Sequence, residues 1–196
     1  MLLGISTSTE ALSIALWDEE TLLASFHDVI GRGHAERLLP AIADVMADKH
    51  ADEIAVDCGP GSFTGVRVGI AAARGLGIAW GAAVRGFSSL PLMAAAVEAA
   101  GPFAIANPAG HGELFFQMFT PDPLRSLGPA RSIPPEEAAR LRGDAPVWGT
   151  GAELVAPGTG DVAYPDARDL RALPSSFLDL PPRPLYLRAP DAKPPA

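Results

Sequence analysis

The stretch Gly59-Pro60-Gly61-Ser62-Phe63-Thr64-Gly65 constrains the fold of this chain more than any other. The apolar run 54–56 leads into it, and a segment rich in small residues, 66–80, follows it. Glycine lets a backbone turn tightly or approach another group closely, and serine or threonine hydroxyls cap the free N–H groups at a helix start. The sequence therefore predicts a strand, a glycine loop and then a helix.

Two roles are open for this glycine loop. Backbone N–H groups at the positive end of a helix suit a phosphate, which would place the loop beside a nucleotide through Gly59, Gly61, Ser62, Thr64 and Gly65. A loop that only turns the chain and caps the helix can use the same residues. The spacing matches neither the Walker pattern, which has a lysine before the Ser/Thr, nor the dinucleotide-binding fingerprint. We favour the capping role in the isolated chain.

Composition narrows the class of protein. The chain has 196 residues, 48% of them hydrophobic, so it can bury a large core, and its single cysteine, Cys58, excludes an internal disulfide framework. It shows no basic leader and no run of about 18 apolar residues that would span a bilayer. The net charge of −8 and the absence of a Lys/Arg cluster argue against nucleic-acid binding by this chain alone. We expect a cytoplasmic protein without membrane contact.

Apolar periodicity predicts the elements of the first half. Three β-prone runs at 2–6, 11–17 and 21–29 indicate an antiparallel meander, and helical spacing of apolar residues predicts an amphipathic helix from His34 to Lys49. The elements expected after these are a strand at 54–57, a helix at 64–80, a strand at 83–87 and a helix at 89–100. A meander followed by crossovers indicates an α/β fold, in which a mixed sheet carries helices on its faces.

The alanine-rich segment of the chain ends at Gly101-Pro102 and the composition changes there, so we place a domain boundary at this point. The expected elements beyond it are strands at 103–107, 113–119 and 145–149, a short helix at 134–142, a helix-like patch at 166–172 and a strand-like run at 185–187. We therefore predict three parts, which are an N-terminal domain at 1–101, a smaller α/β subdomain at 102–188 and a Pro-rich tail at 189–196.

Small residues recur every four positions along the helix that follows the glycine loop, at Gly65, Gly69, Ala73, Gly77 and Gly81. Each glycine costs a helix interior about 1 kcal/mol relative to alanine, so this stripe needs a compensating close contact. The contact is either with the protein's own sheet or with a helix of another subunit. Arg67 and Arg74 are the charged positions of the same helix.

The candidate catalytic groups do not assemble into a recognised motif. His34 starts the amphipathic helix, but the residue four positions on is Leu38, so the paired histidines of a metal site are missing. No nucleophile elbow of the form G-x-S-x-G occurs. Ser6 stands where sugar kinases, actin and heat-shock ATPases carry the acidic residue that serves magnesium. We expect neither a catalytic residue nor a metal site.

Several motifs together resemble one protein family, TsaB, also called YeaZ, which is the dimerisation subunit of the bacterial machinery that makes threonylcarbamoyladenosine in tRNA. The similarity runs from residue 1 to about residue 90 and returns near the end of the chain. It rests on Ser6-Thr7-Ser8-Thr9-Glu10, on Gly33-His34-Ala35-Glu36-Arg37-Leu38-Leu39-Pro40, on the loop Gly59 to Gly65 with Val66-Arg67-Val68-Gly69, and on Pro184-Leu185-Tyr186-Leu187-Arg188. Ser6 replaces the family's usual Asp, and Pro108 to Glu113 replaces a common Asp-Ala-Arg-Arg-Gly-Glu sequence.

This resemblance implies an actin-like, RNase H-like (ASKHA) fold and a place in a complex. The implied partners are a TsaD-type catalytic subunit, which modifies the adenosine next to the anticodon, a TsaE-type ATPase, a second copy of the chain in isolation, and tRNA only through the complex. The chain itself would be a non-catalytic scaffold with no firmly bound cofactor, and ATP or ADP would sit only at a shared interface. The residues expected in the subunit interface are His34, Leu38, Arg67, Gly69, Ala73 and Gly77.

Two enzymatic alternatives compete with the scaffold. The first is a stand-alone ATPase or phosphotransferase of the ASKHA type, working through the Gly59–Gly65 loop. The second is a glycoprotease-like peptidase, which is the least supported because the paired histidines and the nucleophile elbow are both missing.

Overall fold

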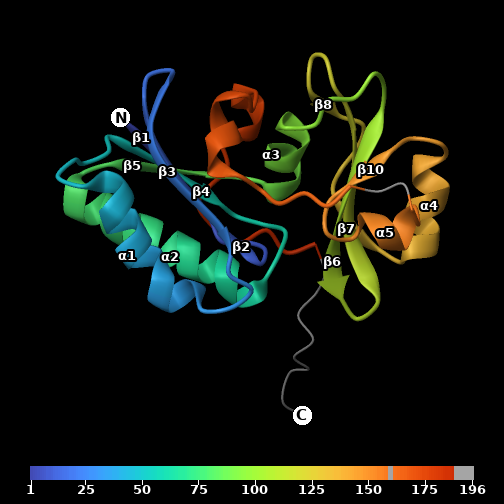
Figure 1. Cartoon of the computed structure of the whole chain (residues 1–196), viewed down its shortest axis with the longest axis horizontal. Helices are drawn as coiled ribbons and strands as arrows, with labels where there is room; N and C mark the ends of the chain where they lie inside the picture. Colours follow the sequence, from blue (N-terminus) through green and yellow to red (C-terminus); the bar gives the residue numbers. More distant parts are fainter. Residues whose placement is uncertain (159–160, 188–196) are drawn as a thin grey trace, which may run out of the picture.

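A computed structural model describes residues 1–158 and 161–187 of the chain. The first half forms a five-stranded sheet in the order β3-β2-β1-β4-β5 (Figure 1). Its strands are β1 (Leu2–Ser6), β2 (Ala11–Asp18), β3 (Thr21–Val29), β4 (Glu53–Asp57) and β5 (Ala83–Phe87). β1 pairs antiparallel with β2 and parallel with β4, which pairs parallel with β5. This mixed order is that of the RNase H-like, actin-like fold, so the predicted fold class is confirmed.

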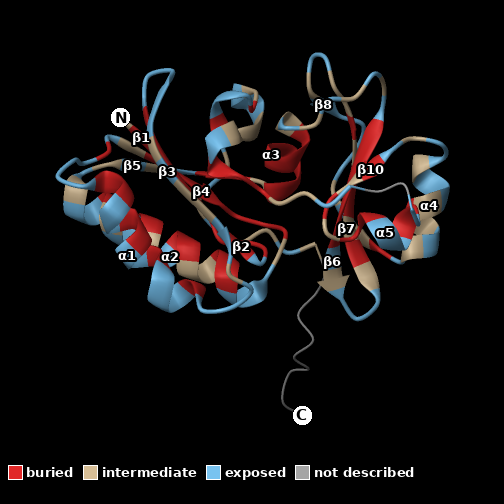
Figure 2. Cartoon of the chain, in the orientation of Figure 1, coloured by how far each residue is buried: buried red, intermediate tan, exposed pale blue. Residues whose placement is uncertain are grey.

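Helices cover both faces of this sheet because its central strands are apolar on both sides. One face packs α1 (His34–Met46) and α2 (Phe63–Trp80) against side chains such as Leu3 and Ile5. The other face packs α3 (Ser89–Ala95) and the 3₁₀ turn η1 (Ala167–Arg171) against Leu2 and Ala15. Figure 2 shows buried residues on the sheet side of α1 and α2 and exposed residues on the outer side.

The second half builds a smaller α/β unit, as predicted, whose sheet packs around a hydrophobic cluster of its own. The strand order is β10-β6-β7-β8, and β9 pairs with β7. Its elements are β6 (Phe103–Gly110), β7 (Glu113–Thr120), β8 (Arg125–Ser126), β9 (Arg131–Ile133), α4 (Pro135–Arg142), β10 (Val147–Trp148) and α5 (Ala152–Val155). Figure 1 shows this sheet beside the first one, with α4 and α5 on its outer side.

The last described segment returns to the first sheet, although we predicted it in the smaller subdomain. Gly86 exchanges two backbone hydrogen bonds with Leu180, and the Leu185 N–H donates to the Cys58 carbonyl at 2.8 Å. The 3₁₀ turn η2 (Ser175–Phe177) lies on the same path. The division at residue 101 stays a prediction, and the predicted tail at 189–196 lies outside the described residues.

Several elements differ from the sequence prediction. α3 ends at Ala95 instead of near residue 100, and 166–172 forms a 3₁₀ turn. The short elements β8, β9 and α5 were not predicted, because runs of two to four residues carry too little periodicity to be recognised. None of the helices in the described part of the chain is long and apolar enough to cross a membrane.

Candidate functional site

We call the part built on the first sheet the first lobe and the part built on the smaller sheet the second lobe. A cleft of about 520 Å³ lies between them. Its first-lobe walls are the turn after β1 (Ser8 to Glu10), the segment that leads into α1 together with the first turn of that helix (Gly31 to Glu36), and the glycine loop. The second lobe contributes Asn107, Pro108 and Thr150. The fold therefore brings the glycine loop and the opening turn, separated by about fifty residues in the sequence, to one wall of one cleft.

The glycine loop starts α2 by a serine cap. The Ser62 hydroxyl accepts a hydrogen bond of 3.2 Å from the Gly65 N–H, whereas the exposed Thr64 lies within the helix. Gly59 has a φ of +88°, a conformation that favours glycine, and a side chain at Gly61 would overlap the backbone of Ser8. The positive φ accounts for the glycine at position 59, and close packing on Ser8 accounts for the glycine at position 61.

The loop and the opening turn hold each other through backbone contacts. The Ser62 N–H donates to the Ser8 carbonyl at 2.6 Å, and the Thr7 hydroxyl donates to the Gly65 carbonyl at 2.8 Å. A side chain at Gly65 would overlap the Thr7 carbonyl. The two segments therefore behave as one packed unit.

Asp57 is the functional group that we missed from the sequence. Its side chain is fully buried, and one carboxylate oxygen, Oδ2, accepts hydrogen bonds from the hydroxyls of Ser6 (2.7 Å) and Ser8 (2.5 Å). The other oxygen, Oδ1, accepts from the Gly59 N–H at 2.8 Å. Burial raises the pKa of Asp57 to about 6, against the lowering effect of these hydrogen bonds.

The missed signal was an acidic residue at the end of an apolar strand, directly before a glycine loop. Because β1 and β4 pair in parallel with Ile5 opposite Val56, Asp57 follows beside Ser6. Position 6 has no carboxylate of its own, and the neighbouring strand β4 therefore places the carboxylate of Asp57 beside it. It is enclosed by donors of its own chain, so it is not presented to the cleft.

Part of the donor set that a magnesium triphosphate would need at this wall is already used within the chain. The N–H groups of Gly59, Ser62 and Gly65 are already bonded within the chain, and Asp57 has no exposed surface. The charged side chains that line the cleft are of both signs: Glu10, Arg32 and Glu36. No group of three or more His, Cys, Asp or Glu that could hold a metal ion occurs in the described part of the chain.

The face of α2 that carries Gly69, Ala73 and Gly77 lies on the protein's own sheet, so their assignment to a subunit interface has no support from their packing and stays a prediction. All three residues are buried. A side chain at Gly69 would overlap Thr7, and one at Gly77 would overlap Val84. Of the two alternatives for the small-residue stripe, the structure shows the intramolecular one.

Leu38 and His34 also face inward. Leu38 belongs to the core between α1 and the sheet, and its assignment to the subunit interface likewise stays a prediction. The buried His34 lines the cleft, and its Nε2 atom lies 3.3 Å from the Ala11 carbonyl oxygen. This contact ties the start of α1 to the start of β2.

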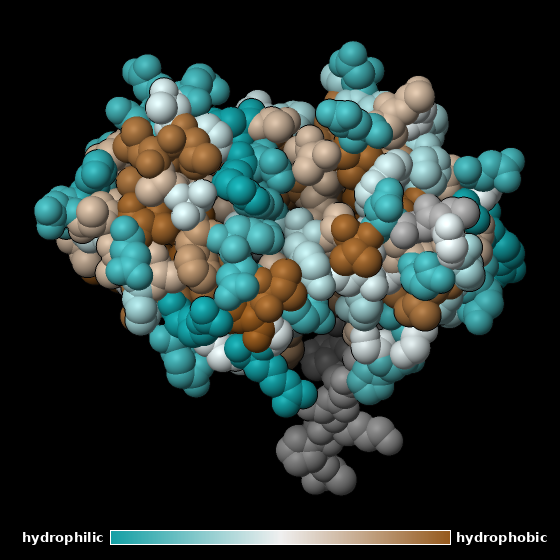
Figure 3. All heavy atoms as spheres, in the orientation of Figure 1, coloured by the Kyte–Doolittle hydropathy of each residue, from teal (hydrophilic) through white to brown (hydrophobic). Residues whose placement is uncertain are grey.

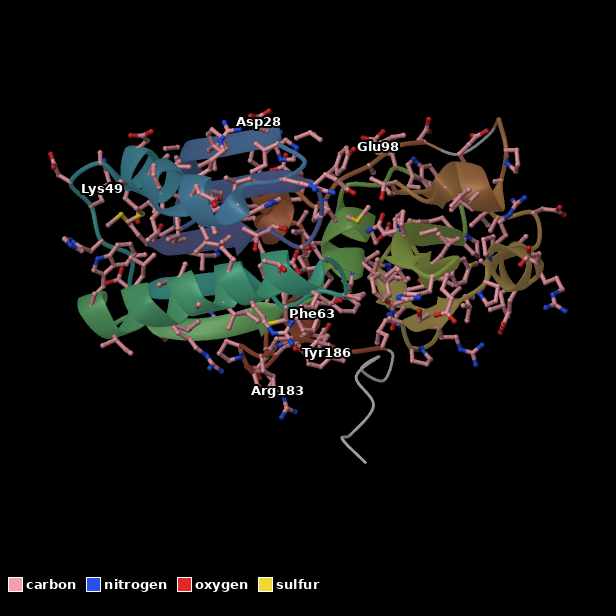
Figure 4. The ribbon with its side chains drawn as sticks, turned by 90° about the horizontal axis from the view of Figure 1, so that it is seen from below. Asp28, Lys49, Phe63, Glu98, Arg183 and Tyr186 are labelled. Atoms are coloured by element: carbon pink, nitrogen blue, oxygen red, sulfur yellow. The ribbon has the colours of Figure 1, made fainter. Side chains whose placement is uncertain are left out.

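Arg67 is the predicted interface residue that reaches the surface. The guanidinium carbon of Arg67 lies 3.2 Å from the centre of the Phe63 ring. The guanidinium N–H groups donate hydrogen bonds to the Phe63 carbonyl and the Tyr186 hydroxyl. The two aromatic side chains lie side by side below α2 in Figure 4. Arg67 thereby fastens residue 186 to the start of α2.

The outer faces of α1 and α2 expose apolar side chains that the sequence prediction had not selected. Ile78 is 87% exposed and Leu39 is 54% exposed. A groove of about 390 Å³ runs between the two helices, and its lining includes Leu39, Ile42, Met46, Leu76 and Trp80. Figure 3 shows apolar surface over the part of the molecule where these helices lie.

Comparisons with known proteins found one matching family model and several similar proteins. A family model described as "TsaD: tRNA N6-adenosine threonylcarbamoyltransferase" matches residues 27–128. The solved structure of YeaZ from Pseudomonas aeruginosa is 32% identical, covers 95% of this chain and 99% of that one, and superposes with a TM-score of 0.80.

Two curated relatives match with lower coverage of their own length. The "tRNA threonylcarbamoyladenosine biosynthesis protein TsaB" of Escherichia coli is 40% identical over 98 residues, which is 47% of this chain and 42% of the relative. An uncharacterized protein of Mycobacterium leprae is 34% identical over 99% of this chain and 56% of its own length. The chain spans about half the length of these two relatives.

Proposed function

This chain belongs to the TsaB (YeaZ) family, and we propose that it is a non-catalytic scaffold subunit that binds and activates a TsaD-type transferase. The transferase would carry out threonylcarbamoylation of the tRNA adenosine next to the anticodon. A TsaE-type ATPase, and tRNA held through the complex, complete the proposed cytoplasmic assembly. In isolation a second copy of the chain would take the partner's place.

The observation that carries this proposal is the apolar outer face of α1 and α2. Ile78 and Leu39 are exposed, and the groove between the helices offers a hollow for apolar side chains of a partner. Burying such residues supplies the free energy of association, which is proportional to the apolar area removed from water. A surface that holds the transferase in its active geometry raises the rate without donating a catalytic group.

The chemistry of the cleft supports the non-catalytic role. Asp57 is enclosed by its own donors and does not reach a substrate, and His34 lies against the Ala11 carbonyl without a second histidine on its helix. ATP or ADP at an interface shared with a partner is part of the proposal, because the partner would have to supply the charges that hold a triphosphate.

An exposed apolar residue on this face provides the test. Ile78→Glu should weaken binding of the purified chain to its TsaD-type partner by at least about tenfold, since a charge would be buried in the interface. It should also lower the rate of tRNA modification when the concentration of this chain limits that rate. Leu127→Glu, a similar change on the second lobe where Leu127 is also exposed, is the matched control. Unchanged affinity of the Ile78 variant, with the fold intact, would place the interface elsewhere.

A further inference from the structure

One flank of α2 carries both positive charge and aromatic surface. Arg67 donates a hydrogen bond to the Tyr186 hydroxyl, and Arg74, about two turns further along the helix, donates one of 2.7 Å to the Pro182 carbonyl. Residues 182–186 therefore run along α2, and Arg183 lies on this segment between the two contacts. We call this surface the arginine flank, and its residues are Phe63, Arg67, Arg74, Arg183 and Tyr186. The sequence shows no arginine cluster here, because Arg74 and Pro182 are 108 positions apart.

The positive charge of the arginine flank has no counter-ion among the residues that the structure describes. Other arginines in this part of the chain pair with carboxylates, whereas Arg67, Arg74 and Arg183 form no ion pair there. The oxygen atoms that accept from Arg67 and Arg74 belong to uncharged carbonyl and hydroxyl groups. Asp179 shares the segment 178–187 with Arg183, but no ion pair joins the two. On a chain with a net charge of −8, this flank is a local positive surface.

The two aromatic rings of the flank lie open beside this charge. Phe63 is 67% exposed and Tyr186 is 55% exposed. The Arg67 guanidinium covers one face of the Phe63 ring, and the exposure of this side chain leaves the other face to solvent. Figure 4 shows Arg183 pointing away from the ribbon on the same side of α2 as both rings. A planar guanidinium matches a phosphate group, and an open aromatic face stacks on an unpaired base.

We propose that the arginine flank contacts RNA in the assembled complex, with its guanidinium groups on phosphates and the open face of Phe63 on an unpaired base. This proposal rests on the proposed function, which brings a tRNA to the complex. An acidic protein surface would also pair with the arginines, but phosphates together with planar rings are the chemistry of a nucleic acid. Three phosphate contacts give only weak affinity on an acidic chain, so the contact forms when the complex already holds the RNA.

The arginine flank borders the proposed partner face. Arg74 and Ile78 are four residues apart, so they are neighbours on one side of α2, and both are exposed. The groove that Leu76 and Trp80 line opens on the other side of the helix. RNA held by a transferase on the partner face would therefore be within reach of the arginines without displacing the transferase.

Binding of unmodified tRNA to the assembled complex, titrated at several salt concentrations, tests the proposal. With Arg74→Gln/Arg183→Gln, affinity should fall by about tenfold, and the slope of log K against log salt should shrink by roughly 1 for each arginine removed. With Phe63→Leu, affinity should fall by about fivefold at the parent's slope, because stacking is not ionic. Arg125→Gln/Arg140→Gln removes the same charge from exposed positions of the second lobe and should match the parent.

The affinity of each variant for the transferase is measured without RNA and should stay within about twofold of the parent. Arg183→Gln alone keeps the test decisive if the double variant does not fold, because the Arg183 side chain makes no hydrogen bond within the described residues. It should shrink the slope by roughly 1.

The outcomes separate this proposal from the proposed function. If the parent does not bind the transferase, both fail. If the complexes form equally but the arginine variants bind tRNA with the parent's affinity and slope, the RNA contact alone is ruled out. If these variants instead lose affinity for the transferase and keep that for tRNA, the flank pairs with an acidic surface of the partner. Unchanged tRNA affinity of a folded Phe63→Leu variant would overturn the base contact.

Discussion

The hydroxyl of Thr7 donates a 2.8 Å hydrogen bond to the carbonyl of Gly65, and the same side chain lies over Gly69 one turn further along α2. This contact places the start of α2 directly on the opening turn. The stripe of small residues is thus explained by a close approach within one chain. The glycines of this stripe within α2, at positions 65, 69 and 77, are tolerated because the backbone of α2 comes near the strand ends and the turn beside them.

Gly69→Leu should consequently destabilise the fold itself instead of only the assembly. The added side chain would overlap Thr7 and meet Val56, and overpacking of this kind lowers the free energy of unfolding by about 1–3 kcal/mol. Gly75→Ala is the control, because nothing lies within 4 Å of that position and alanine favours a helix over glycine by about 1 kcal/mol. Urea denaturation of both variants measures the difference. If the Gly69 variant is as stable as the parent but associates more weakly, the small-residue stripe is a subunit contact instead.

The first sheet and its helices could be predicted because each element is long and strongly periodic. The meander at 2–29, the amphipathic α1 and the glycine loop before α2 all carry local signals that agree with the final fold. The family resemblance rested on these same segments. The second half offered short strands between turn residues, so its elements were placed less completely.

The site was harder to predict, because its key contacts join distant positions. Asp57 becomes informative only when β4 lies beside β1, which brings it to Ser6 across 51 residues of sequence. The element that packs against the small-residue stripe is likewise set by the tertiary structure. Periodicity shows that α2 makes a close contact, but it does not show which element lies against it. The exposure of Ile78 is a tertiary property too, because its position in the apolar sequence of α2 does not distinguish it from the buried residues.

The two hydroxyls of the glycine loop should differ in their contribution to stability. Ser62 caps α2 by accepting from the Gly65 N–H, and Thr64 is exposed within the first turn. Ser62→Ala should therefore lower the free energy of unfolding by about 1 kcal/mol, whereas Thr64→Ala should change it little. Thermal unfolding of both variants checks this. Equal losses would mean that the cap is shared.

Asp169 predicts a specific pH dependence of stability. Burial, and then the negative charge of Asp166, raise its pKa from 3.8 to about 6, although Arg168 opposes this shift. A carboxyl with a higher pKa in the folded state binds its proton more tightly when folded, so its contribution to stability falls as pH rises from about 4 to 6. Asp169→Asn should thus be more stable than the parent at pH 7.5, and this advantage should shrink towards pH 4.

Chemical denaturation of the parent and the Asp169 variant at pH 4, 5, 6 and 7.5 measures this trend. Arg171→Gln, a neighbour in η1 whose own partner is the exposed Glu20, serves as a control for changes of charge in the same segment. An advantage of the Asp169 variant that grows as the pH falls would contradict the assigned direction of the shift.

The isolated chain should bind magnesium-ATP too weakly to saturate in a calorimetric titration. Three N–H groups of the glycine loop, those of Gly59, Ser62 and Gly65, are satisfied within the chain, and the Asp57 carboxylate that could have served a metal is enclosed. Magnesium needs accessible charged oxygen ligands, and a triphosphate needs positive charge to offset its own. Gly61→Val should then lower stability, because its side chain would overlap the Ser8 backbone, without a nucleotide effect on melting. Tight, saturable binding by the parent, abolished in a folded Gly61 variant, would instead favour the stand-alone ATPase.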